Sequence, residues 1–255
     1  MHQLRLFFTA LQFFTRLPIP GWVGFDPAWL NQASRYFPLV GVVVASITGG
    51  AYALASYFLP APVAVVISTA AGIYATGAFH EDGFADMCDG FGGGMTQERV
   101  LEIMKDSRIG AYGAIGTLCM LALKLVTLSM LPPLAAIGAL FVAHPLSRLM
   151  AASLIWRLDY ARAEGKAKPL AQKMSNREFL IAALTVALPV MAAGALHWLP
   201  VSALFSGVVA TAIATFWLAR KCVHRIDGYT GDCLGAVQQV TEVMFYLCVL
   251  ASFTR

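Results

Sequence analysis

Charged residues are scarce in this chain. Only 13% of its 255 residues are Asp, Glu, Lys or Arg, whereas 58% are hydrophobic, and the mean hydropathy is +0.69. A soluble domain carries about 25% charged residues, so this chain has too few to cover a globule of its size with a polar surface. The shortage excludes a soluble enzyme, a disordered chain and a nucleic-acid-binding protein. It predicts an all-α fold, a polytopic helical membrane protein.

Cysteine pairs and regular repeats are lacking as well. The five cysteines are odd in number and show no C-x-x-C spacing, so neither a disulfide framework nor a metal–thiolate site is expected. The 22 glycines and 12 prolines follow no period, which excludes a fibrous protein. No long linker divides the chain. Residues 1–255 are therefore expected to form a single integral membrane domain.

Long apolar runs are what the sequence does contain. Seven of them approach the ~20 residues that a membrane-spanning helix needs: 36–59, 62–79, 111–131, 134–156, 179–197, 201–219 and 235–253. They are preceded by an N-terminal arm, 1–35, in which residues 4–17 predict an amphipathic helix. Its polar face is expected to carry Arg5, Thr9, Gln12 and Arg16. Two positions suit this helix, in the membrane interface or packed against the spans.

The connections between the runs indicate how the chain is oriented. Three connections are short and uncharged, and three are long and polar: 80–110, 157–178 and 220–234. Most of the 18 basic residues lie in the arm or in these three polar loops. Because positive charge gathers on the cytoplasmic side of a membrane, the N-terminus and these loops are expected in the cytoplasm. The net charge of +4 therefore reflects topology, and no nucleic-acid partner is expected.

Half of the 14 acidic residues crowd into residues 81–106. Asp82, Asp86 and Asp89 follow an i, i+4, i+7 spacing, which puts them on one face if the second span continues as a helix to about residue 90. Like charges at this spacing repel one another unless a cation lies between them. Carboxylate oxygens suit Mg²⁺, with Mn²⁺ as a second possibility. The pattern predicts a metal site, and the alternative is a solvated acidic surface.

Candidate phosphate and further metal ligands flank this acidic face. Lys105 and Arg108 follow it and suit phosphate oxygens. In the third polar loop, Asp227 and Asp232 bracket a turn, either as metal ligands or as parts of a capped turn. A glycine run predicts the end of the acidic helix and a backbone that a phosphate can approach; it comprises Gly92, Gly93 and Gly94.

A few ionisable residues fall inside the predicted spans, where they suggest function by default. Counted at about 1.5 Å per residue, His144, Arg148 and Glu242 lie in the cytoplasmic half of their spans. Arg148 and Glu242 either pair with each other or line a cavity beneath the acidic loop. His144 and Arg148 are candidates for substrate binding. Lys124 lies deeper and is expected to extend its amine outward, without a role.

Five motifs occur along the chain in this order: 14–20, 36–41, 80–94, 105–110 and 227–235. Together they resemble those of the cobalamin synthase family, the adenosylcobinamide-GDP ribazoletransferases. The resemblance covers nearly the whole chain. It implies a Mg²⁺-dependent enzyme of the bacterial cytoplasmic (inner) membrane. Such an enzyme joins α-ribazole, or α-ribazole 5′-phosphate, to adenosylcobinamide-GDP, releases GMP and forms adenosylcobalamin or its 5′-phosphate. Apart from the resemblance, the further partners expected are membrane lipid and either a second copy of the chain, in a homo-oligomer, or a pathway complex.

This resemblance also gives the acidic residues roles. Asp82, Asp86 and Asp89 are expected to hold one or two Mg²⁺. Glu81 or Asp89 is expected to accept the proton of the attacking hydroxyl. His80 is a candidate base or ligand, although a single histidine is more often a structural hydrogen-bonding residue.

Two other functions compete with this one. A phosphotransferase of the CDP-alcohol type also carries spaced aspartates at the ends of spans, but the Ala-Arg pair of that pattern is missing at the expected place. A corrinoid transporter predicts charges near the bilayer midplane and broken spans there. The sequence instead gathers its acid on one surface, which favours the transferase.

Overall fold

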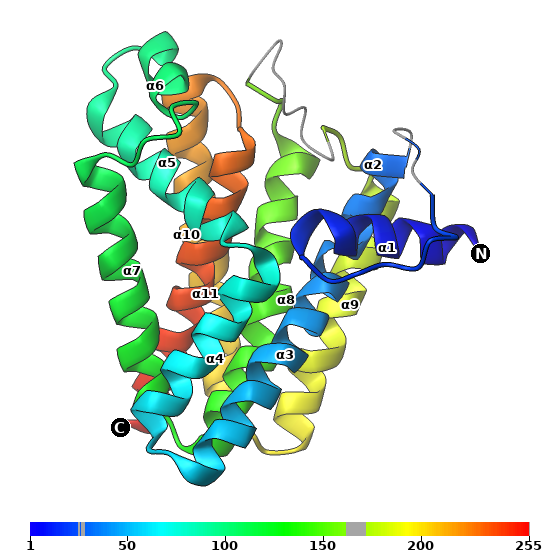
Figure 1. Ribbon diagram of the computed structural model, residues 1–255, viewed down its shortest axis with the longest axis vertical. Helices are drawn as coiled ribbons and strands as arrows, with labels where there is room; N and C mark the ends of the chain where they lie inside the picture. The colour runs from blue at the N-terminus through cyan, green and yellow to red at the C-terminus, as the bar shows by residue number, and fades with distance from the viewer. Residues whose placement is uncertain (25, 27–28, 162–171, 255) are drawn as a thin grey trace.

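The computed structural model describes residues 1–24, 26, 29–161 and 172–254. In this part of the chain all named elements are helices, so the all-α prediction is confirmed. Figure 1 shows them as one bundle of long helices with shorter ones across it and at one end. The elements are α1 His2–Phe14, α2 Trp29–Ala33, η1 Ser34–Tyr36, α3 Phe37–Phe58, α4 Ala61–Thr76, α5 Phe79–Gly93, α6 Gln97–Ile103, α7 Ala111–Ser129, α8 Pro133–Arg157, α9 Asn176–Ala195, α10 Val201–Ile226 and α11 Gly231–Phe253.

The number of candidate spans agrees with the sequence. Among the described residues, six helices are long and apolar enough to cross a membrane, and the bent pair α4–α5 brings the number to seven if it counts as one span. The six are α7, α8, α9, α10, α11 and the continuous stretch Trp29–Phe58 that ends with α3. The chain therefore has the helices of a multi-pass membrane protein.

The second span differs from its prediction. It does not continue into the acidic helix, because α4 ends at Thr76, with Gly77 as its C-cap, and the axis of α5 is turned by 88° from that of α4. Gly77 and Ala78 both have left-handed backbone, at φ +66° and +59°, a conformation that glycine adopts without strain. Arg16 lies against the break: its N–H donates to Ala75 O at 2.8 Å, and its Nε would lie 2.6 Å from a Cβ at Gly77.

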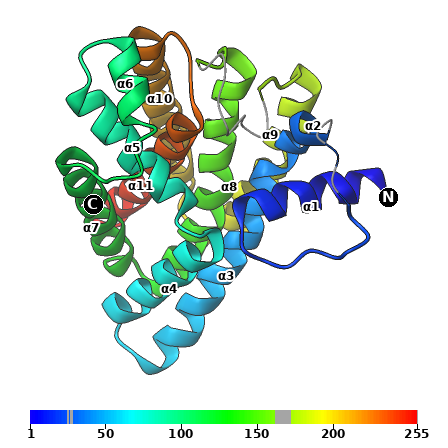
Figure 2. The same ribbon diagram turned by 45° about the horizontal axis from the view of Figure 1, so that its top comes forward.

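The N-terminal helix α1 lies across the bundle beside α3 (Figures 1 and 2). The ring of Phe14 is centred 4.5 Å from that of Phe37 and 5.5 Å from that of Phe79. Packing against the spans is thus confirmed, and a position in the membrane interface stays a prediction. The prediction that Thr9 lies on the polar face of α1 was wrong. Thr9 is buried, and its hydroxyl donates to Arg5 O at 2.8 Å.

Helices α3 and α8 approach almost to backbone contact. A Cβ added at Gly41 of α3 would lie 2.6 Å from His144 O and 2.7 Å from Pro145 Cα of α8, which is closer than packed atoms tolerate. The close crossing also brings the Thr48 hydroxyl to His144 Nε2, at 3.1 Å. The glycine on α3 therefore fixes where the imidazole of α8 lies.

The polar connections meet at one end of the bundle, at the top of Figure 1. Helix α6 begins after the cap residue Thr96, whose hydroxyl accepts the N–H of Arg99 at 3.3 Å, and Gln97 donates to Ile226 O at 3.0 Å. The turn before α11 pairs with the segment after α8, since Tyr229 N donates to Asp159 O at 3.1 Å. In the second loop, 157–178, residues 162–171 lie outside the described part of the chain.

Replacing Gly41 by alanine is expected to lower the free energy of unfolding by about 1–3 kcal/mol, because the new methyl group overlaps the backbone of α8. Thermal unfolding in detergent measures the loss. Gly50→Ala on the same helix is the matched control, since nothing lies within 4 Å of its added Cβ, and alanine there favours the helix. Equal midpoints for the two variants would show that α3 and α8 do not depend on this contact.

Candidate functional site

The acidic helix α5 packs against α7 on one side and α11 on the other. A Cβ at Gly83 would lie 3.0 Å from Asp232 Cα in the first turn of α11. A Cβ at Gly116 of α7 would lie 2.8 Å from Cys88 Sγ of α5. Because small residues stand at both contacts, α5 lies directly on two candidate spans (Figure 2). Its carboxylates are therefore positioned by membrane helices.

Asp89 holds the start of α7. Its side chain is buried, Oδ2 accepts the N–H of Gly110 at 2.7 Å, and Oδ1 accepts the N–H of Gly113 at 2.8 Å. These amides at a helix N-terminus lack partners within the helix and carry its positive partial charge. Both oxygens of Asp89 are thus engaged by the start of α7.

The three aspartates of α5 do not form the expected three-carboxylate metal site. Nowhere in the described ranges do three or more His, Cys, Asp or Glu side chains converge to hold a metal ion. Asp82 is exposed and Asp86, one turn further, is half-buried. Asp232 starts α11 next to Gly83, which lies between them on α5. Mg²⁺ is commonly bound by one or two carboxylates together with substrate phosphates, so this donor set fits an ion that a phosphate helps to hold.

Asp227 belongs to a capped turn. It ends α10 with left-handed backbone at φ +55°, its side chain is exposed, and its N–H donates to Val223 O at 3.0 Å. Thr230 then caps α11, because its hydroxyl accepts the N–H of Cys233 at 3.4 Å. The hydroxyl of Thr230 also donates to Asp232 Oδ2 at 3.2 Å. Of the two aspartates in this loop, only Asp232 approaches α5.

The glycine run ends α5, as predicted, but Gly92 and Gly93 form the last turn of the helix instead of an open loop. Phosphate binding by these glycines stays a prediction. Their N–H groups belong to the helix, and the N–H of Gly94 donates to Gly90 O at 2.9 Å. Packing requires glycine at two of these positions. A Cβ at Gly92 would lie 2.5 Å from the Tyr112 ring, and one at Gly94 would lie 2.6 Å from Val100 Cγ2.

Arg225 stabilises the end of α5 and was missed by the sequence analysis. From the last turn of α10, its Nη1 donates to Phe91 O at 3.0 Å and its Nη2 donates to Gly94 O. A cation at a helix C-terminus satisfies free carbonyls and opposes the negative end of the helix dipole. In the sequence, Arg225 is one of several basic residues in the loop 220–234, and no pattern there indicates that it binds the end of α5.

Lys105 and Arg108 lie between α6 and α7, and both are exposed. Arg108 Nη2 pairs with Asp106 Oδ2 at 2.7 Å, and its hydrogen bonds hold the pKa of the Asp106 carboxyl at about 2. An exposed pair of this kind contributes little to stability, so the guanidinium stays available to an anion. The structure thus leaves both side chains exposed, and phosphate binding by them stays a prediction.

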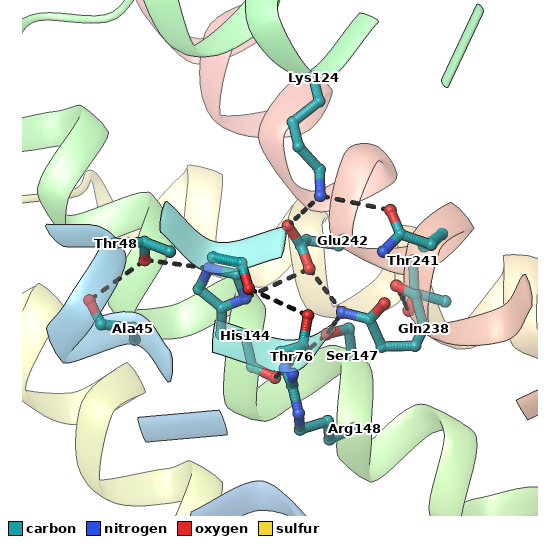
Figure 3. A network of polar contacts seen from close by, with 12 residues as sticks. Ala45, Thr48, Thr76, Lys124, His144, Ser147, Arg148, Gln238, Thr241 and Glu242 are labelled. Atoms are coloured by element: carbon teal, nitrogen blue, oxygen red, sulfur yellow. Dashed lines mark hydrogen bonds and ion pairs between the residues drawn. The ribbon is translucent and has the colours of Figure 1, made fainter. Parts of the chain in front are cut away.

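A buried ionic network joins α7, α8 and α11 beneath α5 (Figure 3). Glu242 is only 1% exposed, and its Oε1 lies 2.8 Å from Lys124 Nζ. Its Oε2 lies 3.3 Å from His144 Nδ1 and accepts the Gln238 amide at 2.6 Å. The expectation that Lys124 extends outward was wrong, because the buried carboxylate holds the amine inside the bundle, where a charge without a partner is costly.

The network reaches α5 through one glutamine. Lys124 Nζ donates to Gln239 Oε1 at 3.3 Å, which turns the amide nitrogen of Gln239 toward Glu81, and Nε2 donates to Glu81 Oε1 at 2.9 Å. Glu81 Oε2 has no hydrogen-bond partner. The deep charges and the acidic helix are therefore one connected set.

A cavity of about 30 Å³ lies at the centre of this set. Arg148 and Glu242 both line it, as do His80 and Glu81, which agrees with the second of the two arrangements expected for Arg148 and Glu242. Arg148 Nη1 donates to His144 O at 3.0 Å, whereas its Nε has no partner. This volume holds one or two waters and no nucleotide. The described structure thus offers substrate no room at His144 or Arg148, and substrate binding there stays a prediction.

A signal in the sequence could have found this network. Lys124 stands in the middle of one apolar run. Gln238, Gln239 and Glu242 lie within about one helical turn of one another in the last apolar run, 235–253. A buried lysine requires a partner of opposite charge, and Glu242 is the acidic residue inside a predicted span.

Lys124→Met is expected to lower the free energy of unfolding by about 3–5 kcal/mol, because it leaves a buried carboxylate without its main counter-ion. Adding Glu242→Gln to the same chain is expected to recover most of that loss. Unfolding in detergent micelles measures both variants, with exposed Lys173→Met as the control. Equal losses in the single and double variants would mean that the charge pair is not what stabilises these helices.

Comparisons with known proteins agree with this architecture. A family model described as cobalamin-5-phosphate synthase matches residues 6–250. An adenosylcobinamide-GDP ribazoletransferase of Shewanella frigidimarina (strain NCIMB 400) is 45% identical over 98% of this chain and 96% of the relative. One of Ralstonia nicotianae (strain ATCC BAA-1114 / GMI1000) is 47% identical over 97% and 95%. No solved structure matches the chain. By both comparisons, this chain belongs to the cobalamin-5-phosphate synthase family.

Proposed function

We propose that this chain is an adenosylcobinamide-GDP ribazoletransferase. The observation that carries the proposal is 44–47% identity, over nearly the full length of both chains, to relatives with that name. In this reaction the 3′-hydroxyl of α-ribazole, or of its 5′-phosphate, attacks the phosphorus that links cobinamide to GMP. The new P–O bond forms as the pyrophosphate bond breaks, and GMP leaves. The products are GMP and adenosylcobalamin or its 5′-phosphate.

Phosphoryl transfer of this kind depends on positioning and on neutralising charge. Asp82, Asp86 and Asp232 are the residues that would hold Mg²⁺, which neutralises phosphate charge when bound. Lys105 and Arg108 are exposed and would bind phosphate oxygens. Of the two carboxylates that are candidate bases, Glu81 is favoured over Asp89, because Glu81 Oε2 has no hydrogen-bond partner whereas both oxygens of Asp89 accept backbone N–H groups.

The orientation proposed for the chain follows from its basic residues. Arg99, Lys105, Arg108 and Arg225 lie on the segments that gather at one end of the bundle, around α5 and α6 (Figure 1). Because positive residues stay on the cytoplasmic side, this end and the N-terminus would face the cytoplasm, in the inner membrane of a bacterium. Substrates would then reach α5 from the cytoplasm.

A corrinoid transporter is the less favoured function. The structure contains the two features that a transporter predicts, a sharply bent helix pair and charges buried within candidate spans. The prediction from the sequence that the chain lacks these features was therefore wrong. However, the cavity at these charges has a volume of about 30 Å³, far below the several hundred Å³ typical of a small-molecule site. A corrinoid cannot pass there in this conformation.

Purified protein in detergent, given adenosylcobinamide-GDP, α-ribazole and Mg²⁺, is expected to release one GMP for each cobalamin formed. Chromatography of both products measures the ratio. CMP release from a CDP-alcohol would assign the chain to the other phosphotransferase class. Corrinoid uptake by vesicles without product formation would assign it to transport.

Asp82→Asn and Asp86→Asn are each expected to reduce GMP release at least 100-fold while the protein still folds, because oxyanion and phosphate stabilisation of this kind contributes about 10²–10³ in rate. Glu102→Gln is the matched control, since Glu102 is an exposed carboxylate on the neighbouring helix α6 and pairs only with Arg99 among the described residues. Turnover of either aspartate variant at the rate of the control would contradict the assignment.

Removing divalent cations with EDTA is expected to abolish GMP release, and added Mg²⁺ or Mn²⁺ is expected to restore it, because hard oxygen ligands suit these ions. Isothermal titration of Mg²⁺ with substrate present measures the binding. Full activity in EDTA would remove the metal from the proposed mechanism and leave the substrate assignment intact.

A further inference from the structure

Helices α8 and α10 leave a groove between them that the proposed reaction does not use. Its volume is about 750 Å³, within the range of sites for small molecules. The walls are mainly apolar, with Met150 and Leu154 on α8 and Ala212, Phe216 and Ala219 on α10. Phe216 is 64% exposed, so this wall faces outward from the bundle.

One end of the groove is strongly basic. Its lining there includes Arg157, the last residue of α8, and Arg220 and His224, near the end of α10. Aromatic rings support both guanidiniums: Arg157 Cζ lies 3.6 Å from the centre of the Trp156 ring, and Arg220 Cζ lies 5.8 Å from that of Phe216. Among the ion pairs of the described residues, neither arginine has a carboxylate partner. The basic end is therefore complementary to an anion.

The dimensions of the groove match one leaflet of a bilayer. From Ala212 to His224 it extends roughly 18 Å along α10, at 1.5 Å per residue. Half of the hydrocarbon core measures about 15 Å. Both helices are candidate membrane spans, and the two arginines lie at or near the ends of these helices.

We propose that this groove binds one anionic phospholipid. Its phosphate lies between Arg157 and Arg220, and one acyl chain lies along Met150, Ala212 and Phe216. Basic residues near the membrane surface attract anionic lipids electrostatically, and the apolar walls bury chain methylenes. The bound lipid bridges α8 and α10 close to Arg225, which holds the end of α5. This site does not depend on the proposed enzymatic function.

Native mass spectrometry of the full chain in detergent tests the headgroup. Phosphatidylglycerol is expected to bind at least tenfold more tightly than phosphatidylcholine with the same acyl chains, and Arg157→Gln/Arg220→Gln is expected to remove that preference. Arg99→Gln/Arg177→Gln is the matched control, because it removes two exposed arginines outside the groove. Equal affinity for the two lipids, or an unchanged preference in the Arg157/Arg220 variant, would overturn the proposal.

A second variant tests the chain site. Ala212→Trp fills the apolar wall and is expected to weaken phosphatidylglycerol binding about tenfold or more, whereas Leu184→Trp, on the exposed surface of α9, is expected to leave it unchanged. Equal binding by these two variants would overturn the proposal. So would displacement of the lipid by GDP, which assigns the groove to a nucleotide, or conversion of a dimer to a monomer by Ala212→Trp, which assigns it to a second copy.

Discussion

The buried carboxylate of Glu242 is the constraint on which the arrangement of the helices depends. A charge at 1% exposure among apolar spans is tolerated only with a close counter-charge and hydrogen bonds. Lys124 on α7 is the counter-charge, Gln238 donates a hydrogen bond, and the His144 ring on α8 lies 3.3 Å away. Three spans are thus held in one register. The same lysine orients Gln239, and Gln239 in turn donates a hydrogen bond to Glu81 of α5. The acidic helix is therefore placed by charges lying below it.

The position of α5 also requires the break after α4. Helix α5 packs on α7 and α11, and its axis differs by 88° from that of α4. The 88° turn at Gly77 sends α5 between them, where Gly83 permits contact with α11 and Asp89 accepts two amides of α7. Asp89 is thereby used for structure. Asp82 remains exposed and Asp86 half-buried, on a helix that is fixed on both sides.

The sequence predicted those features that depend on neighbouring residues. Apolar runs predicted the spans, and the glycine run predicted the end of α5. The features it missed depend on distant residues. The left-handed turn at Gly77 is supported by Arg16 from the N-terminal arm, and Lys124 remains inside because of Glu242 on the last helix. The glycines at 92–94 show a different limit: a backbone that must approach a phosphate and one that must approach Tyr112 or Val100 both require glycine, so composition alone does not distinguish them.

These contacts also suggest why a reaction between water-soluble groups is carried out by a membrane protein. The carboxylates of α5 are positioned by membrane helices, because α5 packs on α7 and α11, which are candidate spans. Its far end is held by Arg225 of α10, another candidate span, and its first turn is linked through Gln239 to an ion pair inside the bundle. In water, the exposed leucines, isoleucines and phenylalanines of these spans would favour aggregation over this arrangement. The bilayer is thus a condition for the site to form.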